Sequence, residues 1–525
     1  MSAVDTLDPQ ARAAAPVRSG WSWRTYWAAL TVLSLLLGLW GLATPRFAVP
    51  DEPAHFLKAA AVVRGQLIGL PERPTRFGLP PAIADTRFQT GCFVFLPEVP
   101  ADCPPGQGGS GTGPGDVVAY TAAGKYPPAY YALVGLPTLV WPDLRAVHAA
   151  RGVSAALSAA LLAAAVTAAA IGRHRVAGLA IGVAVTPMVL FVASGLNPSG
   201  PEIAAAAALW ASGAALALGT GPPARPLVGT LGVSAVVVAL SRPISPFWVA
   251  LIGVALLLLA GWRRVVELLR VRGVQVAVAA VVLACAAQAT WILTSASLEL
   301  YGAGRRVPLL ERLRTSAGLT DERLRQLVGW FGWLDTPPPL AVHLAWAAVL
   351  LVVVVVAVRR SRPRAVAVAG LLAVGVLVVP VVLEARSISD VGYFWQGRYT
   401  LPLAVGVPLV LAAGSRASAR RPLLALLLTV VAACHLVVYV VALGRYTVGT
   451  GNGLGLVDEQ WAPPLPALVL AAAFAAVLLG WSAVLFRCGG QPNGGADSGP
   501  DAAAASGDGT SDRRSASGRP GPPGA

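Results

Sequence analysis

Apolar runs of about 17 to 25 residues recur along nearly the whole chain, which is the length that a helix needs to cross the hydrocarbon core of a bilayer. The runs are unbroken, which disfavours the alternating pattern of membrane β-strands. The pattern therefore predicts an all-α integral membrane protein with about twelve transmembrane helices. The predicted spans are 27-44, 147-171, 176-196, 201-219, 226-241, 244-260, 274-296, 340-358, 365-383, 398-413, 422-443 and 465-486.

The composition excludes an ordinary soluble protein. Of the 525 residues, 56% are hydrophobic and only 12% are charged, and the mean hydropathy is +0.66. Soluble domains contain roughly 45 to 50% apolar and about 25% charged residues. The 56 glycines and the abundant alanines favour helices that pack closely in lipid, because small residues let backbones approach one another.

The formal net charge of +15 could indicate a nucleic-acid partner, but the positions of the charges argue against one. Five short loops on one side of the predicted topology hold fourteen arginines and a single acid, Glu267. Since cytoplasmic loops are rich in basic residues, both termini are expected in the cytoplasm. No loop large enough to form a domain has a basic face with interleaved aromatics, so no nucleic-acid partner is expected. The arginines are Arg173, Arg175, Arg225, Arg263, Arg264, Arg270, Arg272, Arg359, Arg360, Arg362, Arg364, Arg416, Arg420 and Arg421.

The chain divides into three predicted parts. Residues 1-26 form a basic cytoplasmic segment, and no small-residue cleavage site follows the first span, so an uncleaved signal anchor is expected. Residues 27-486 form the polytopic membrane domain. Residues 487-525 contain almost no large apolar side chains, which predicts a disordered cytoplasmic tail, because such a composition cannot offset the entropy of ordering.

The polar material on the outer side lies mainly in the loops 45-146, 297-339 and 384-397. Long outer loops beside short inner ones indicate chemistry or recognition on the outer face. Cys92 and Cys103 both fall in the first loop, where an oxidising compartment favours a disulfide between them. The sequence contains no cluster of Cys and His residues with the spacing of a metal site. The motifs of ATP-driven transport and serine hydrolysis are also absent from the sequence.

Two adjacent carboxylates, Asp51 and Glu52, follow the first span, and His55 lies four positions after Asp51. One interpretation is a helix start, because acidic residues and a proline are favourable at a helix N-terminus. The other is a catalytic or metal site, in which one carboxylate takes a proton from an attacking hydroxyl and its neighbours orient it or hold a cation. The spacing alone does not decide between these interpretations.

Four motifs in the same order resemble a bacterial group of membrane proteins, the domain-of-unknown-function 2142 family. They are PDEPAHF at 50-56, KYPPAYYALVG at 125-135, FGWLDTPPP at 331-339 and QGRYTLP at 396-402. The resemblance covers roughly residues 27 to 450.

That family is similar in layout to the GT-C glycosyltransferases, which have many spans and an acidic motif at the start of a long first outer loop. The resemblance implies that Asp51 or Glu52 is the catalytic base and that the donor is a polyprenyl phosphate sugar. It also implies that segment 129-142 is an outer juxtamembrane helix rather than a span. No soluble domain follows the last predicted span, whereas several GT-C enzymes have one, so acceptor recognition would come from the loops.

Transfer from a lipid-linked sugar needs cationic groups at the departing phosphate. Arg398 follows Gln396 and precedes Tyr399 at an outer span end, and its guanidinium could bind phosphate or simply snorkel to the interface. Arg242, in a very short outer hairpin, could bind phosphate or reach water. Tyr130 could stack on a sugar or anchor an interfacial helix.

Two further pairs of polar residues are expected to be structural. Glu384 and Arg386, at a span end, are expected to pair with each other. Asn197 and Glu202 lie in a segment rich in ordinary turn residues, which favours a simple turn.

The sequence therefore predicts a GT-C-like glycosyltransferase on the outer face of the bacterial cytoplasmic membrane, acting in cell-envelope glycan assembly. Its expected partners are membrane lipid, a lipid-linked sugar and an acceptor glycan or glycolipid. No cofactor is required by the motifs, although a divalent cation could assist. The alternatives are a transporter or flippase for a lipid-linked intermediate, which would use the same residues for binding, and a non-catalytic membrane scaffold.

Overall fold

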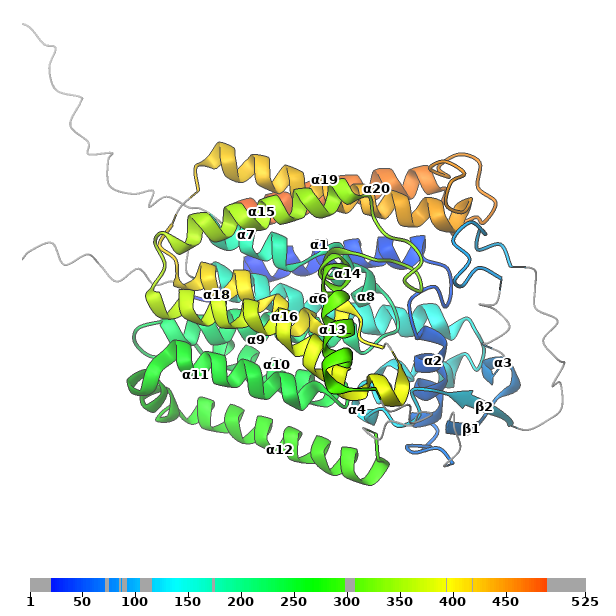
Figure 1. Ribbon diagram of the computed structural model, residues 1–525, viewed down its shortest axis with the longest axis horizontal. Helices are drawn as coiled ribbons and strands as arrows, with labels where there is room; N and C mark the ends of the chain where they lie inside the picture. The colour runs from blue at the N-terminus through cyan, green and yellow to red at the C-terminus, as the bar shows by residue number, and fades with distance from the viewer. Residues whose placement is uncertain are drawn as a thin grey trace, which may run out of the picture. The chain divides into compact units, whose positions relative to one another are not determined.

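The computed structural model describes residues 20–70, 75–84, 86, 92–103, 116–171, 175–297, 307–392, 394–417 and 419–488. The predicted disordered tail lies almost wholly outside these residues, as does most of the predicted N-terminal segment. The described residues belong to one unit, within which helices pack side by side along a common direction (Figure 1).

Within the described residues, ten helical segments are long and apolar enough to cross a membrane, and together they confirm an all-α, multispan chain. Nine are single helices, and the tenth, Gly397–Gly414, combines a 3-10 turn, η2 (Gly397–Thr400), with α17 (Leu401–Ala404) and α18 (Gly406–Gly414). The nine are α1 (Trp23–Ala43), α6 (Ala146–Ala170), α9 (Ser199–Leu218), α11 (Ser245–Leu269), α12 (Arg272–Ser295), α15 (Leu340–Val358), α16 (Pro363–Val391), α19 (Arg421–Thr447) and α20 (Ala467–Cys488).

Each of the twelve predicted spans coincides with helical structure, but the exact number is not confirmed. The predicted span 176-196 is a pair of helices, α7 (Arg175–Ala184) and α8 (Pro187–Ser194). The chain bends by 55° between them. The bend follows from Pro187, which has no N–H to continue the hydrogen bonding of α7. The hydroxyl of Thr186 instead accepts from Val189 N at 3.3 Å and begins α8. The predicted span 226-241 is α10 (Arg225–Ser241), which at 17 residues is shorter than the others.

The alanine-rich helix α9 lies at the centre of the packing and is almost entirely buried. It contacts α6, α10, α11 and α18. The approach of α18 is close, because a Cβ on Gly406 would come within 2.4 Å of the Trp210 ring. Trp210 also donates to the carbonyl of Pro402 at 2.9 Å. Small residues therefore set the spacing of the central helices.

The predicted first outer loop, 45-146, has its own small core at one end of the helices (Figure 1). It contains α2 (Glu52–Val62), the antiparallel strands β1 (Thr75–Leu79) and β2 (Val117–Thr121), and α3 (Pro81–Ala84). Segment 129-142 forms two short helices, α4 (Pro128–Val134) and α5 (Pro137–Val140), and neither could span a bilayer. Their exposed side chains are Leu133, Leu136, Leu139 and Val140, followed by Trp141. In the second outer loop lie α13 (Leu309–Gly318) and α14 (Thr320–Val328).

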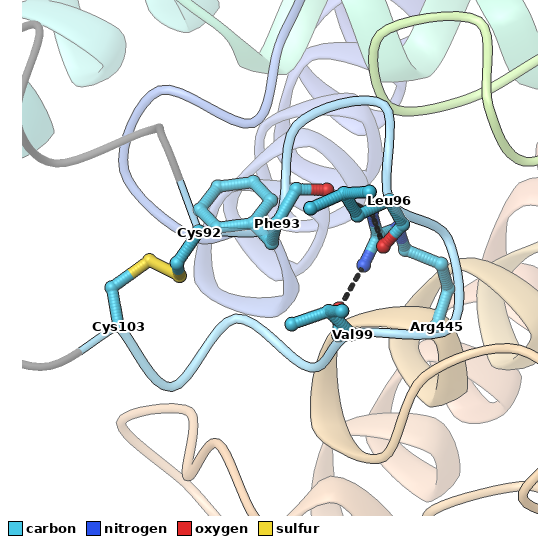
Figure 2. The surroundings of a disulfide bond; sticks show 6 residues. All are labelled: Cys92, Phe93, Leu96, Val99, Cys103 and Arg445. Atoms are coloured by element: carbon cyan, nitrogen blue, oxygen red, sulfur yellow. Dashed lines mark hydrogen bonds between the residues drawn. A yellow bond between two sulfur atoms is a disulfide. The ribbon is translucent and has the colours of Figure 1, made fainter.

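Cys92 and Cys103 form a disulfide in the structure, and Arg445 at the end of α19 holds the loop between them (Figure 2). The Arg445 guanidinium donates to the carbonyls of Phe93 at 2.6 Å and Val99 at 2.8 Å. It also pairs with Asp335 at 3.0 Å, although both side chains are buried. This network fixes two loop segments, around Phe93 and Asp335, on the end of α19.

Candidate functional site

Asp51 occupies the position immediately before α2, so the predicted helix start is found at this point. Its backbone is left-handed, with φ 63° and ψ 4°, and its side chain makes no capping hydrogen bond. A non-glycine residue in this conformation costs roughly 1–2 kcal/mol, and such strain is characteristic of functional sites. The carboxylate is 44% exposed and accepts a hydrogen bond from Arg398 Nη2 at 2.5 Å. Asp51 is thus an accessible carboxylate paired with a buried cation.

Glu52 has a different environment, because its carboxylate is fully buried and all its partners come from the protein. Arg151 donates to it through Nε at 2.7 Å and Nη2 at 2.6 Å. The backbone N–H groups of Phe47 and Leu196 donate at 2.8 and 2.9 Å. With four hydrogen bonds the carboxylate has no accessible lone pair left for an acceptor hydroxyl. The geometry favours an anchoring role for Glu52 over the predicted role as base.

Arg151, which sequence reasoning missed, joins α6 to the end of α1 and the start of α2. From α6 it donates not only to Glu52 but also to the carbonyls of Thr44 at 2.7 Å and Pro45 at 2.6 Å, at the end of α1. The sequence did contain a signal, because Arg151 is a single arginine within an otherwise apolar span. Charged residues within membrane spans normally pair with another polar group. The Arg151–Glu52 pair therefore fixes the backbone on both sides of Asp51.

Arg398 lies in η2 and is 1% exposed. Its Nη2 contacts Asp51 and, at 3.4 Å, the hydroxyl of Tyr399. Its Nε and Nη1 are buried and have no hydrogen-bond partner among the described residues. Buried N–H groups of a guanidinium are costly to leave unpaired. The arrangement is therefore suited to an anion that would accept from these two nitrogens.

Arg242 supplies a second cation beside the first. Its guanidinium carbon lies 4.2 Å from the centre of the Tyr399 ring, and that of Arg398 lies 5.2 Å from the same ring. The carboxylate of Glu202 lies 3.5 Å from Arg242 and also accepts from the Ser245 hydroxyl at 2.5 Å. The expectation that Glu202 belongs to a simple turn is wrong, because it is a fully buried counter-ion in the first turn of α9.

Asp51 is held ionised by its surroundings. Burial raises the pKa of its carboxyl, but the positive charges of Arg398 and Arg242 and a contribution from His55 bring the pKa below its ordinary value. Burial lowers the pKa of His55 itself to about 3. His55 is therefore neutral near pH 7, and its Nδ1 lies 2.8 Å from the hydroxyl of Tyr131. A neutral imidazole can orient a neighbouring group but adds no charge to bind phosphate.

The family model described as "Predicted membrane protein (DUF2142)" matches residues 33–407 of the chain. The chain belongs to this family. The match confirms the membership predicted from the four motifs and, with the ten long apolar helices, establishes a multi-pass membrane protein. No curated protein matches the chain.

Among solved structures, the DUF2142 chain is similar to the crystal structure of ArnT from Cupriavidus metallidurans bound to undecaprenyl phosphate. The similarity covers 88% of this chain and 76% of that chain, with 14% identity and a TM-score of 0.41. A TM-score and a sequence identity this low do not establish a shared fold. The GT-C-like layout of the DUF2142 chain therefore stays a prediction.

Of the predicted substrate-binding residues, Gln396 and Tyr130 have contrasting environments in the DUF2142 chain. The Gln396 side-chain oxygen is buried and has no partner in the described part of the chain. Tyr130 is 6% exposed and donates to the Ser154 hydroxyl at 3.0 Å, within the core of the first outer loop. Gln396 is thus available to a ligand beside Arg398, whereas Tyr130 is committed to packing.

The expected Glu384–Arg386 pair is wrong. Glu384 is buried and pairs with Arg323 of α14, while Arg386 is exposed. The Glu384 carboxylate also accepts from the backbone N–H of Trp395 at 3.0 Å. Its role is to fix the segment that leads into Arg398. Within the described residues, no group of three or more His, Cys, Asp or Glu side chains could hold a metal ion.

Lys58, on α2, was not anticipated from the sequence. Its Nζ is buried and donates to the carbonyls of Leu67 at 2.5 Å and Gly124 at 2.7 Å. Burial lowers the pKa of Lys58 to about 7. Because the unfolded chain keeps this proton up to the ordinary lysine pKa of about 10.4, stability should rise with pH between these two values.

Replacing Lys58 by Met should remove this dependence. In detergent, the melting temperature of the wild-type chain is expected to rise between pH 7 and pH 10 relative to that of Lys58→Met. Lys125→Met, at the half-buried lysine, is the control and should keep the rise. Identical pH profiles for the wild type and Lys58→Met would show that the pKa of Lys58 is not lowered in the folded chain.

Proposed function

We propose that the chain is a GT-C-like membrane glycosyltransferase that takes a sugar from a polyprenyl phosphate donor. One observation carries the proposal. The accessible carboxylate of Asp51 lies against Arg398, a buried arginine whose Nε and Nη1 have no partner in the part of the chain that the structure describes. A base and an anion-binding group thus lie side by side, as transfer from a phosphate leaving group requires.

In the proposed mechanism Asp51 accepts the proton of an acceptor hydroxyl as its oxygen attacks the anomeric carbon. The bond between that carbon and the phosphate oxygen breaks, and the lipid phosphate leaves with the electron pair. Its charge grows from one to two negative charges, which Arg398 and Arg242 would stabilise. Of the two acidic residues, Asp51 is the proposed base because the Glu52 carboxylate is fully occupied.

The proposed setting is the outer face of a bacterial cytoplasmic membrane, with both termini in the cytoplasm and a role in cell-envelope glycan assembly. The arginine-rich short loops support this orientation. The acceptor is a glycan or glycolipid. The exposed apolar side chains of α4 and α5 suit the outer membrane interface, where a lipid-linked donor carries its phosphate.

Replacing Arg398 by Gln should weaken binding of undecaprenyl phosphate, used as the probe, by roughly 10- to 100-fold, because hydrogen bonds to charged groups contribute about 1.5–3 kcal/mol. Binding can be measured by native mass spectrometry of the purified full chain. Arg325→Gln, which removes an arginine from a surface pair on α14, is the matched control and should bind as the wild type does.

If Arg398→Gln binds the probe as tightly as Arg325→Gln does, the phosphate site is not at Arg398 and the proposal fails. Loss of folding is checked separately from the melting temperature. A variant that melts like the wild type but no longer retains the probe supports the proposed phosphate site.

A further inference from the structure

A cavity lies at the opposite end of α9 from Asp51. Its volume is about 480 Å³, and its wall is built from α6, α7, α9, α10 and α18. The part of α9 that lines the cavity begins at Ala211, so at about 1.5 Å per residue the cavity lies roughly 20–30 Å from the Asp51 end of this helix. Most of the lining residues have apolar side chains, among them Ala169, Ala180, Ala214, Leu227, Leu409 and Ala412.

Two arginines, Arg264 and Arg362, also line this cavity. Arg264 donates through Nε to the carbonyl of Leu216 at 3.1 Å, and Arg362 donates through Nη1 to that of Leu218 at 3.0 Å. Both guanidinium groups are therefore held at the C-terminal end of α9, where the helix dipole favours positive charge. Two cations are thereby brought to one mouth of an apolar cavity.

The two guanidinium groups retain hydrogen-bonding capacity. Arg264 Nη2 and both Nε and Nη2 of Arg362 have no hydrogen-bond partner within the described ranges. The acid paired with Arg264 is Glu267, whose side chain is 59% exposed. No carboxylate lines the cavity among the residues that the structure describes. The site therefore combines free donors, positive charge and an apolar interior.

We infer that this cavity binds an anionic glycerophospholipid of the cytoplasmic leaflet, with its phosphate between Arg264 and Arg362 and an acyl chain in the alanine-lined interior. Basic pockets between transmembrane helices on the cytoplasmic side are known to hold acidic lipid headgroups. The volume falls within the roughly 300–1,000 Å³ of ligand pockets. A small soluble anion would leave the apolar interior unexplained, whereas a phospholipid fills both parts.

The positive-inside bias alone does not explain this arrangement. Arg263 contributes as much positive charge to this side of the membrane as its neighbour Arg264 does. Arg263 is nevertheless exposed and is not among the residues that line the cavity. The inference rests on the proposed membrane orientation but not on the proposed transferase activity, because it concerns the other end of the bundle.

The test compares the purified full chain and its variants by native mass spectrometry with phosphatidylglycerol or phosphatidylcholine. The wild type is expected to retain phosphatidylglycerol preferentially. Arg362→Gln should bind it roughly fivefold more weakly, and the double variant with Arg264→Gln about 25-fold, if each arginine contributes as basic groups at a membrane surface do. Arg263→Gln, the matched control, should bind like the wild type.

Three results would overturn the inference. The first is equal binding of the two lipids by the wild type. The second is an equal loss of binding in Arg263→Gln and Arg362→Gln, which would indicate non-specific attraction. The third is preferential displacement of phosphatidylglycerol from this site by undecaprenyl phosphate, which would make the occupant a polyprenyl lipid. The Arg362 side chain is exposed and donates one hydrogen bond, to the carbonyl of Leu218, so its single variant is expected to fold.

Discussion

Replacing Asp51 by Asn should reduce sugar transfer by roughly 100- to 10,000-fold, the range that a general base contributes. The amide has nearly the same shape but cannot accept the proton of the attacking hydroxyl. Because the side chain is 44% exposed and carries one ion pair, folding and donor binding should be retained. The measurement is incorporation of labelled sugar from a lipid-linked pool into membrane glycan, in vesicles that contain the wild type or the variant.

The control for this experiment is Asp321→Asn, at an exposed acid on α14 whose side chain is 75% exposed. It should transfer sugar at the wild-type rate. The pH profile gives a second readout. Because the positive charge of Arg398 helps to lower the pKa of Asp51, activity should stay level as pH falls toward 5. In Arg398→Gln the loss of activity should begin at higher pH. Full activity of Asp51→Asn would exclude Asp51 as the base.

Replacing Arg151 by Met should destabilise the chain by about 3–5 kcal/mol, the usual cost of breaking a buried ion pair. The substitution leaves the Glu52 carboxylate buried without its cation and also removes donors to the carbonyls of Thr44 and Pro45. The expected result is a much lower melting temperature in detergent. Restoring charge balance with Glu52→Gln in the same chain should recover part of the loss.

The double variant distinguishes the anchoring role from a catalytic one. If Glu52 is an anchor, Glu52→Gln alone should lower the melting temperature, and its effect should not add fully to that of Arg151→Met. If Glu52→Gln instead melts like the wild type and loses transfer, Glu52 is the base, and the assignment to Asp51 is wrong.

The spans could be predicted because a helix in lipid must satisfy its backbone internally, so apolar runs of sufficient length mark them directly. The break between α7 and α8 was less evident. Pro187 lies within an apolar run, and its effect depends on the cap that Thr186 provides. The incorrect Glu384–Arg386 pair has a simple cause, since residues two positions apart on a helix do not face each other.

The difference between Asp51 and Glu52 could not be predicted from the sequence, where they are equivalent neighbours. It arises from the left-handed backbone at Asp51 and from Arg151, whose position is 99 residues beyond Glu52. Arg398 and Arg242 were identified because they lie at predicted outer span ends, where a guanidinium could bind the phosphate of a lipid-linked donor. Both guanidinium groups lie near the ring of Tyr399. This arrangement depends on tertiary packing and could not be predicted from the local sequence.

The most direct test of the central claim is mass spectrometry of lipid-linked sugars and surface glycans in a deletion strain of the host cell. The strain is complemented with the wild type, Asp51→Asn or Asp321→Asn. The account predicts that deletion removes one glycan modification and accumulates its polyprenyl phosphate sugar, and that Asp321→Asn rescues the defect while Asp51→Asn does not. Full rescue by Asp51→Asn would contradict catalysis at this carboxylate and favour a transporter or scaffold.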